Sequence, residues 1–340
     1  MWPMSVWGFD RSAAGARGVV STAYSSCTRF RVLTALGIDT RQVAERIYGI
    51  TVAGQSPFAF ETGMRFERAL LMHEAKYLIA QYVYVGRFTA AEAVLLDVGT
   101  APSPQAATLD ILTRRASGDL TTPTLLWQAA LPSPIPGELI RPDLLVAGPH
   151  DRFYRPVEVK SYEERGGLTS DADIESAASQ VAVSVVSLRA LANYGYPRDA
   201  FLADIILRAP SGMTPRLRTV SVERDVSVIE EQMRAFPLTE AHVQDVLRSL
   251  GVDRLDSQKS LEAIPHRFGP GCREKCSLVD ACKKRAIDAG ELSRFGGPLA
   301  ESLAPYATQG EIADAIARGE SNPTLDAYAL GVAALDELLA

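Results

Sequence analysis

Two stretches near the middle of the chain, residues 139–146 and 153–162, are rich in branched apolar or aromatic residues interrupted by single charged positions. Short apolar runs of this kind, rich in branched residues, are typical of β-strands. Residues 148–151 between them read Gly-Pro-His-Asp, which favours a tight turn. The pattern therefore predicts a β-hairpin at the centre of the chain.

The spacing of apolar residues elsewhere predicts an α/β protein with helices on either side of a sheet. Helices are expected at 22–36, 63–84, 173–195 and 226–250, the last broken near Pro237, with strands at 200–209 and 216–225 and a connection at 40–62. Residues 1–20 are expected to be weakly ordered, 21–286 to form the main domain with an elaboration at 86–135, and 287–340 to form an acidic, mostly helical extension.

The register of the hairpin brings charged side chains together. If the turn centres between residues 150 and 151, Asp143 faces Glu158 and Arg141 faces Lys160. Glu158 and Lys160 are two residues apart, so they point to the same side of the sheet. Two facing carboxylates repel each other, and a divalent cation such as Mg²⁺ would turn this repulsion into a binding site. Lys160 could then orient an attacking water or stabilise a phosphoryl oxygen. The alternative is a surface hairpin whose carboxylates face water.

Four cysteines lie near the two ends of the chain and none lies between. Cys27 is near the start, and Cys272, Cys276 and Cys282 form a C-x3-C-x5-C run near the end. Four thiolates suit either tetrahedral Zn²⁺ or an iron–sulfur cluster. The first residues contain no sustained apolar stretch of a signal peptide, so we expect a cytoplasmic protein in which disulfides are disfavoured. Cys27 could alternatively be an inert buried thiol.

Charge and hydropathy narrow the possible partners. The formal net charge of the 340-residue chain is −6, which argues against a protein that coats DNA through a basic surface. A local positive channel remains possible, with solvated helix ends as the alternative. Its candidate residues are Arg29, Arg31, Arg273, Lys275, Lys283, Lys284 and Arg285. No apolar stretch is long enough to span a bilayer, so no membrane partner is expected.

The hairpin residues Asp143 and Glu158-Val159-Lys160 resemble the PD-(D/E)XK nuclease superfamily. The four cysteines are similar to those of its RecB-like iron–sulfur branch, which includes CRISPR-associated adaptation exonucleases and AddB-type nuclease domains. The first cysteine gap is one residue longer than the family's usual C-x2-C-x5-C. The resemblance covers about residues 20–286. It implies a restriction-endonuclease-like core, a central mixed sheet flanked by helices, with a helical region stapled by a [4Fe–4S] cluster; zinc is the fallback.

The same resemblance implies further site residues. Glu67 matches an acidic position on a helix that precedes the hairpin in this family, and the Val159 carbonyl is a further metal ligand there. Gln180 matches a glutamine that contacts metal-bound water or the nucleic-acid backbone, whereas Ser184 stands where the family often has tyrosine. The catalytic set would be Asp143, Glu158, Lys160 and Gln180, the metal set Glu67, Asp143, Glu158 and Val159, and the cluster set Cys27, Cys272, Cys276 and Cys282.

The implied activity is Mg²⁺- or Mn²⁺-dependent hydrolysis of DNA, at single-stranded or free ends, in DNA repair or in anti-phage or CRISPR defence. No phosphate-binding G-x-x-x-x-G-K-[ST] loop is present, so a helicase would have to be a separate partner, as would a CRISPR-adaptation protein. The first alternative is a non-catalytic, nucleic-acid-binding scaffold subunit of a larger nuclease or helicase assembly. A zinc-stabilised enzyme of unrelated chemistry is the second.

Overall fold

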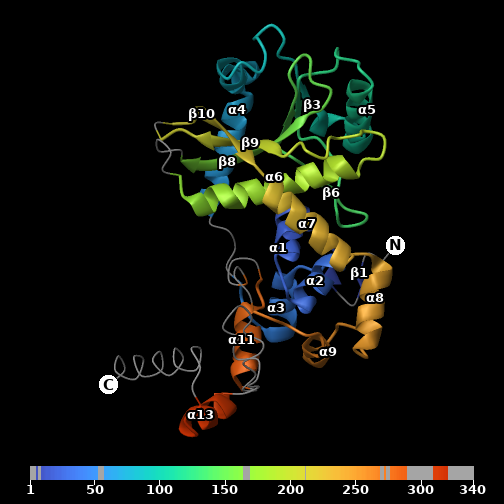
Figure 1. Ribbon diagram of the computed structural model, residues 1–340, viewed down its shortest axis with the longest axis vertical. Helices are drawn as coiled ribbons and strands as arrows, with labels where there is room; N and C mark the ends of the chain where they lie inside the picture. The colour runs from blue at the N-terminus through green and yellow to red at the C-terminus, as the bar shows by residue number, and fades with distance from the viewer. Residues whose placement is uncertain are drawn as a thin grey trace. The chain divides into compact units, whose positions relative to one another are not determined.

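The computed structural model describes two compact units, which are treated separately (Figure 1). The described residues are 5–6, 9–52, 57–163, 169–210, 212–268, 272, 276–288 and 309–320. The sheet unit comprises Ala13–Tyr24 and Ala53–Thr239. The cysteine unit comprises Met1–Ser12, Ser25–Val52 and Glu240–Ala340.

The sheet unit is built on a six-stranded mixed sheet with the order β10-β9-β8-β7-β4-β3. Its members are β3 Leu95–Asp97, β4 Leu125–Trp127, β7 Leu144–Val146, β8 Arg155–Glu163, β9 Leu202–Arg208 and β10 Pro215–Ser221. The pairs β8–β9 and β3–β4 are parallel, and the other neighbouring pairs are antiparallel. Two short strands, β5 Leu131–Pro132 and β6 Leu139–Ile140, pair separately.

Helices cover both faces of this sheet. The helix α4, Pro57–Tyr84, packs Phe66, Leu70 and Leu78 against Val157 and Val159 in one continuous core. The helix α6, Asp171–Ala190, covers the opposite face and connects the parallel strands β8 and β9 (Figure 1). The remaining helices of the unit are α1 Gly15–Ala23 and α7 Glu223–Ala235, which contact α6, and α5 Pro104–Ala116, which follows the 3₁₀ turn η1 Val98–Thr100. The α/β class and the flanked mixed sheet are thus confirmed.

The cysteine unit is mostly helical in its described part. It contains the strand pair β1 Ser5–Val6 and β2 Phe9–Asp10, and the helices α2 Thr28–Ala35, α3 Thr40–Tyr48, α8 Glu240–Ser249, α9 Gln258–Ala263, α11 Val279–Asp288 and α13 Gln309–Ala317. The buried Arg29 joins α2 to the segment after α9, because its backbone N–H donates to the Pro265 carbonyl at 3.0 Å. None of the described helices has the length and apolarity needed to cross a bilayer.

Most element predictions hold, with three corrections. The single helix predicted at 22–36 is wrong: α1 ends at Ala23, and Cys27 becomes the N-cap of α2. The stretch 40–62 is not a plain connection, because Asp39 caps α3 and the glycine at 49 ends it with a positive φ of 64°. The predicted strand 139–146 is also divided, with residues 139–140 pairing with β5 and 144–146 with β8. Of the predicted C-terminal extension, 287–340, the structure describes residues 287–288 at the end of α11 and residues 309–320; the rest lies outside the described residues.

Candidate functional site

The central hairpin has the predicted register along the whole of β7. Leu144 pairs with Val157 and Val146 with Arg155, so continuing this register places Asp143 beside Glu158. The Val159 N–H donates to Asp143 Oδ2 at 2.7 Å, which fixes the carboxylate against β8. Because the ladder stops at Leu144, the predicted pairing of Arg141 with Lys160 does not form part of it.

Lys160 connects the hairpin to α6. Its Nζ donates to Glu158 Oε1 at 2.6 Å and to Gln180 Oε1 at 3.0 Å. The two charged side chains are 17% and 12% exposed, so the pair is largely shielded yet open on one side. Gln180 is buried and its Nε2 donates to the Ser176 carbonyl at 3.1 Å, which sets the direction of its amide. The predicted residues Glu158, Lys160 and Gln180 therefore meet in one network.

The carboxyl of Asp143 is strongly perturbed. Burial raises its pKa well above the usual range, and the nearby Glu158 raises it further. The hydrogen bond from Val159 and the charge of Lys160 act in the opposite direction, and Glu67 adds another raising influence. Negative charge thus accumulates around Asp143, although Lys160 neutralises part of it.

Glu67 on α4 interacts electrostatically with the same site. Burial raises the pKa of its carboxyl, Lys160 lowers it and Glu158 raises it, so these three groups share one electrostatic environment. Val159 contributes only its backbone, because its side chain packs in the core against α4. Ser184, one turn after Gln180 on α6, is buried and offers no phenol in place of the family's tyrosine.

The site has the donor atoms that a divalent cation prefers, but its described side chains are not yet arranged around one position. The carboxylates of Asp143, Glu158 and Glu67 are the hard oxygen donors that Mg²⁺ and Mn²⁺ prefer, and with Lys160 they leave two excess negative charges when all are ionised. The part of the chain that the structure describes nevertheless contains no group of three or more His, Cys, Asp or Glu side chains already arranged to hold a metal. The donor chemistry therefore fits a divalent ion, and binding would require side chains such as Glu158 to rotate.

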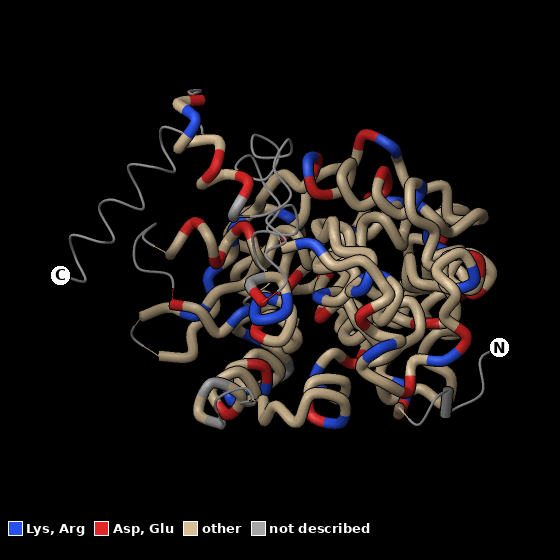
Figure 2. Tube along the Cα trace, turned by 90° about the horizontal axis from the view of Figure 1, so that it is seen from below, with Lys and Arg blue, Asp and Glu red and all other residues tan. Residues whose placement is uncertain are grey.

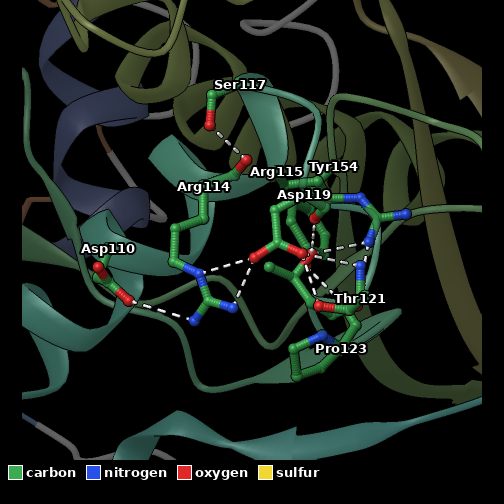
Figure 3. Close-up of polar contacts among 9 residues, drawn as sticks. Asp110, Arg114, Arg115, Ser117, Asp119, Thr121, Pro123 and Tyr154 are labelled. Atoms are coloured by element: carbon green, nitrogen blue, oxygen red, sulfur yellow. Dashed lines mark hydrogen bonds and ion pairs between the residues drawn. The ribbon is translucent and has the colours of Figure 1, made fainter.

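The turn of the hairpin is held by a buried arginine that the sequence did not single out. Arg115 on α5 donates to the carbonyls of Gly148, Asp151 and Thr122. Its guanidinium lies 5.1 Å from the ring centroid of Tyr154, and both residues are drawn in Figure 3. These contacts tie both ends of the β7–β8 turn to α5. Arg115 is 0% exposed, and nothing in the residue pattern distinguishes it from the exposed arginine before it.

All four cysteines belong to the cysteine unit, and none of them forms a disulfide. The Cys276 N–H donates to the Cys272 carbonyl at 3.0 Å, and Cys27 caps α2 by accepting from the Phe30 N–H at 3.5 Å. Burial raises the pKa of Cys276 to about 12 and of Cys282 to about 11. Interactions with the other thiols raise both values further, so the four side chains influence one another.

Arg29 was a candidate for the positive channel, but it is buried and not available to nucleic acid. It is 2% exposed, its Nη1 donates to Cys282 Sγ at 3.1 Å, and its Nη2 donates to the Ile264 carbonyl at 3.0 Å. The role of this arginine is therefore within the cysteine unit. Arg285 pairs with Glu262 at 3.6 Å, Lys283 and Lys284 are exposed, and Arg273 and Lys275 lie outside the described residues. Acidic and basic positions are interspersed along the chain (Figure 2).

No family model matches the chain, and a search of curated proteins finds no match either.

Proposed function

We propose that the chain is a metal-dependent deoxyribonuclease whose active site is formed by Asp143, Glu158, Lys160 and Gln180. The observation that carries this proposal is the position of Lys160 Nζ, which lies 2.6 Å from Glu158 Oε1 and 3.0 Å from Gln180 Oε1. The neighbouring carboxylate of Asp143 is held by the Val159 N–H. A lone surface hairpin gives no reason for a buried glutamine to meet this lysine. Perturbed acidic groups around a partly shielded amine are typical of catalytic sites.

The chain's own residues have separable roles. An ammonium carries three N–H donors, and two of those on Lys160 are used by Glu158 and Gln180. In the described residues no third acceptor is present, so the remaining donor can position the attacking water or a phosphoryl oxygen. Gln180 holds the amine in place from α6. A bound Mg²⁺ or Mn²⁺, with Asp143, Glu158, Glu67 and the Val159 carbonyl as ligands, would stabilise charge that develops on the phosphate oxygens.

We further infer a restriction-endonuclease-like core and membership of the RecB-like branch. The support is a mixed sheet with α4 on one face and α6 on the other, with Asp143 immediately before β7 and Glu158 and Lys160 on β8. DNA with single-stranded or free ends is the proposed substrate class. A helicase or a CRISPR-adaptation protein is the proposed type of partner.

The cysteines are proposed to bind a [4Fe–4S] cluster, with Zn²⁺ as the alternative. Four cysteines from the two ends of the chain, none of them in a disulfide, occur in one unit and interact electrostatically, and four thiolates suit either centre. Arg29 would then donate a hydrogen bond to a ligand sulfur, which is one way in which proteins adjust a cluster. Iron, sulfide and zinc analysis of anaerobically purified protein separates the two centres.

Cleavage of end-labelled single-stranded DNA, with Mg²⁺, Mn²⁺ or EDTA present, tests the nuclease proposal. We expect products with either metal and none with EDTA. The alternative, a non-catalytic scaffold subunit, is favoured by the absence of a ready-made trio of metal ligands in the described residues. Stoichiometric DNA binding without cleavage in any metal would support the scaffold and contradict the nuclease.

A further inference from the structure

A hollow in the sheet unit lies at the start of β8, away from Lys160. Its volume is about 290 Å³, and its lining includes Arg87, Arg152 and Arg155. Arg155 is the first residue of β8 and Lys160 lies five positions later, so their Cα atoms are roughly 16 Å apart at about 3.3 Å per residue. The hollow is therefore separate from the carboxylate site.

Arg155 is held in this hollow by a buried acid. Its Nη1 lies 3.3 Å from Asp204 Oδ1, and Asp204 is 1% exposed. The same carboxylate oxygen accepts a hydrogen bond from Thr219 Oγ1 at 2.7 Å, so Asp204 is itself fixed. The Arg155 side chain remains 22% exposed, and its other guanidinium N–H groups have no acceptor among the described residues. A guanidinium anchored from one side presents its remaining donors in a fixed direction.

The other two arginines are less constrained. Arg87 Nη1 lies 3.6 Å from Asp151 Oδ2, an ion pair with both side chains partly exposed. Arg152 is exposed and makes no hydrogen bond or ion pair within the described part of the chain. Asp151 and Asp199 also line the hollow; Arg87 is paired with Asp151 and Arg155 with Asp204, which leaves Arg152 as the lining guanidinium that makes no ion pair within the described residues. The Arg152 guanidinium and the Arg155 N–H groups that do not donate to Asp204 are therefore the donors left for an anionic ligand.

Aromatic rings form another part of the lining. Phe153 is half-buried and packs edge-on against Tyr194 at 5.3 Å and Tyr196 at 6.0 Å between ring centroids. Phe201, also in the lining, carries the Arg189 guanidinium 4.6 Å from its ring centroid. These neighbours hold both rings in place. Bases stack on such rings, whereas guanidiniums bind phosphate through paired hydrogen bonds.

We propose that this pocket binds one nucleotide, with its phosphate on Arg87, Arg152 and Arg155 and its base against Phe153 or Phe201. The volume is at the lower end of the range for small-molecule sites, which suits a single nucleotide better than a longer ligand. Asp199 can accept a hydrogen bond from a sugar hydroxyl. The same chemistry occurs in a free nucleoside monophosphate and in the phosphorylated end of a strand. This inference goes beyond the nuclease proposal and does not depend on it.

Isothermal titration of the full chain with deoxyadenosine 5′-monophosphate, in EDTA, tests the pocket without the carboxylate site. We expect saturable binding that Arg152→Ala weakens about tenfold, because it removes one charged phosphate contact. Arg216→Ala, an exposed arginine on β10, is the matched control and should bind like the parent, as should Lys160→Ala. Deoxyadenosine and inorganic phosphate should each bind more weakly than the nucleotide.

A second pair of titrations separates the two sources of the nucleotide. Oligonucleotides with a 5′-phosphate and a 5′-hydroxyl are compared in the parent and in Arg152→Ala. A preference for the 5′-phosphate that Arg152→Ala abolishes supports a strand end, and binding of the monophosphate without such a preference supports a free nucleotide. The proposal is overturned if the monophosphate fails to bind and the 5′-phosphate has no effect. Equal affinities of the parent and Arg152→Ala for every ligand would also overturn it.

Discussion

Lys160 and Gln180 come from different elements, β8 and α6, and their side chains meet at 3.0 Å between Nζ and Oε1. The glutamine is buried and its own amide is held by the Ser176 carbonyl. Gln180 is thus a positioning residue for the lysine, which also contacts Glu158. Replacing it tests whether the direction of the amine matters for cleavage.

We expect Gln180→Leu to lower kcat for DNA cleavage by about tenfold to a hundredfold, the usual effect of removing a residue that orients a catalytic group. The KM and the melting temperature should change little, because leucine fills similar volume. Gln180→Glu keeps an acceptor for Lys160 and should restore part of kcat. Ser184→Ala, one turn further along α6 and also buried, is the control and should keep full activity. An unchanged kcat in Gln180→Leu would contradict the positioning role.

Asp143 is expected to destabilise the metal-free protein. Burial raises the pKa of its carboxyl well above the usual range, so the folded state holds the proton more tightly than the unfolded chain does. The stability of the metal-free protein should therefore fall as pH rises from about 4, the unfolded value, through the higher folded pKa. Asp143→Asn keeps an acceptor for the Val159 N–H and removes the charge.

At pH 7 in EDTA, Asp143→Asn should raise the free energy of unfolding by about 1 kcal/mol, a shift of roughly 2–4 °C in Tm. Its stability should also depend less on pH than that of the parent. Added Mn²⁺ should raise the Tm of the parent and leave that of the variant unchanged. A lower Tm for the variant in EDTA would show that the carboxylate stabilises the fold, contrary to the proposed metal site.

Arg114 and Arg115 are neighbours on α5, and replacing each in turn compares an exposed with a buried arginine in its effect on the free energy of unfolding. Arg115 is fully buried and donates to two carbonyls of the β7–β8 turn and to the Thr122 carbonyl. Arg114 forms exposed ion pairs with Asp119 and Asp110 (Figure 3). We expect Arg115→Ala to lower the free energy of unfolding by about 3 kcal/mol, since it leaves buried acceptors unpaired. Arg114→Ala should cost less than about 1 kcal/mol. Urea denaturation followed by circular dichroism measures both, and equal effects would contradict the assigned role of Arg115.

Removal of one cysteine tests the metal centre of the cysteine unit. Cys27→Ser should lose most of the iron and acid-labile sulfide per chain and most of the visible absorbance, because four thiolates hold the proposed cluster. Ser26→Ala, the preceding residue, is the control and should keep its iron. Zinc in place of iron in the parent would establish the alternative centre. If Cys27→Ser retains a full complement of metal, Cys27 is not a ligand.

The sequence predicted the parts of the fold that depend on local pattern. The hairpin register followed from one turn and the alternation around Glu158, and the break between α7 and α8 followed from Pro237. The boundary between α1 and α2 was missed, because the cap at Cys27 does not disturb the apolar spacing. Arg115 and Asp204 could not be found, since their burial results from contacts between residues far apart in the chain.

The sequence predicted which residues form the candidate site, but it did not predict all of the contacts between them. Asp143, Glu158 and Lys160 share a hairpin, so register alone brings them together. The contact of Gln180 with Lys160 was not predicted, because it depends on how α6 crosses the sheet, and the expected contact of Gln180 with water or DNA stays a prediction. Arg29 was expected at the surface, and its burial against Cys282 depends on packing between the two ends of the cysteine unit.

Single-turnover cleavage of end-labelled single-stranded DNA by Lys160→Ala tests the central claim most directly. Lys76→Ala, an exposed lysine on α4, is the control, and circular dichroism checks that both variants fold. The account predicts that the parent and Lys76→Ala cleave the DNA in Mn²⁺ and that Lys160→Ala is slower by at least about a hundredfold. Cleavage by folded Lys160→Ala at the rate of the parent would contradict the proposed active site.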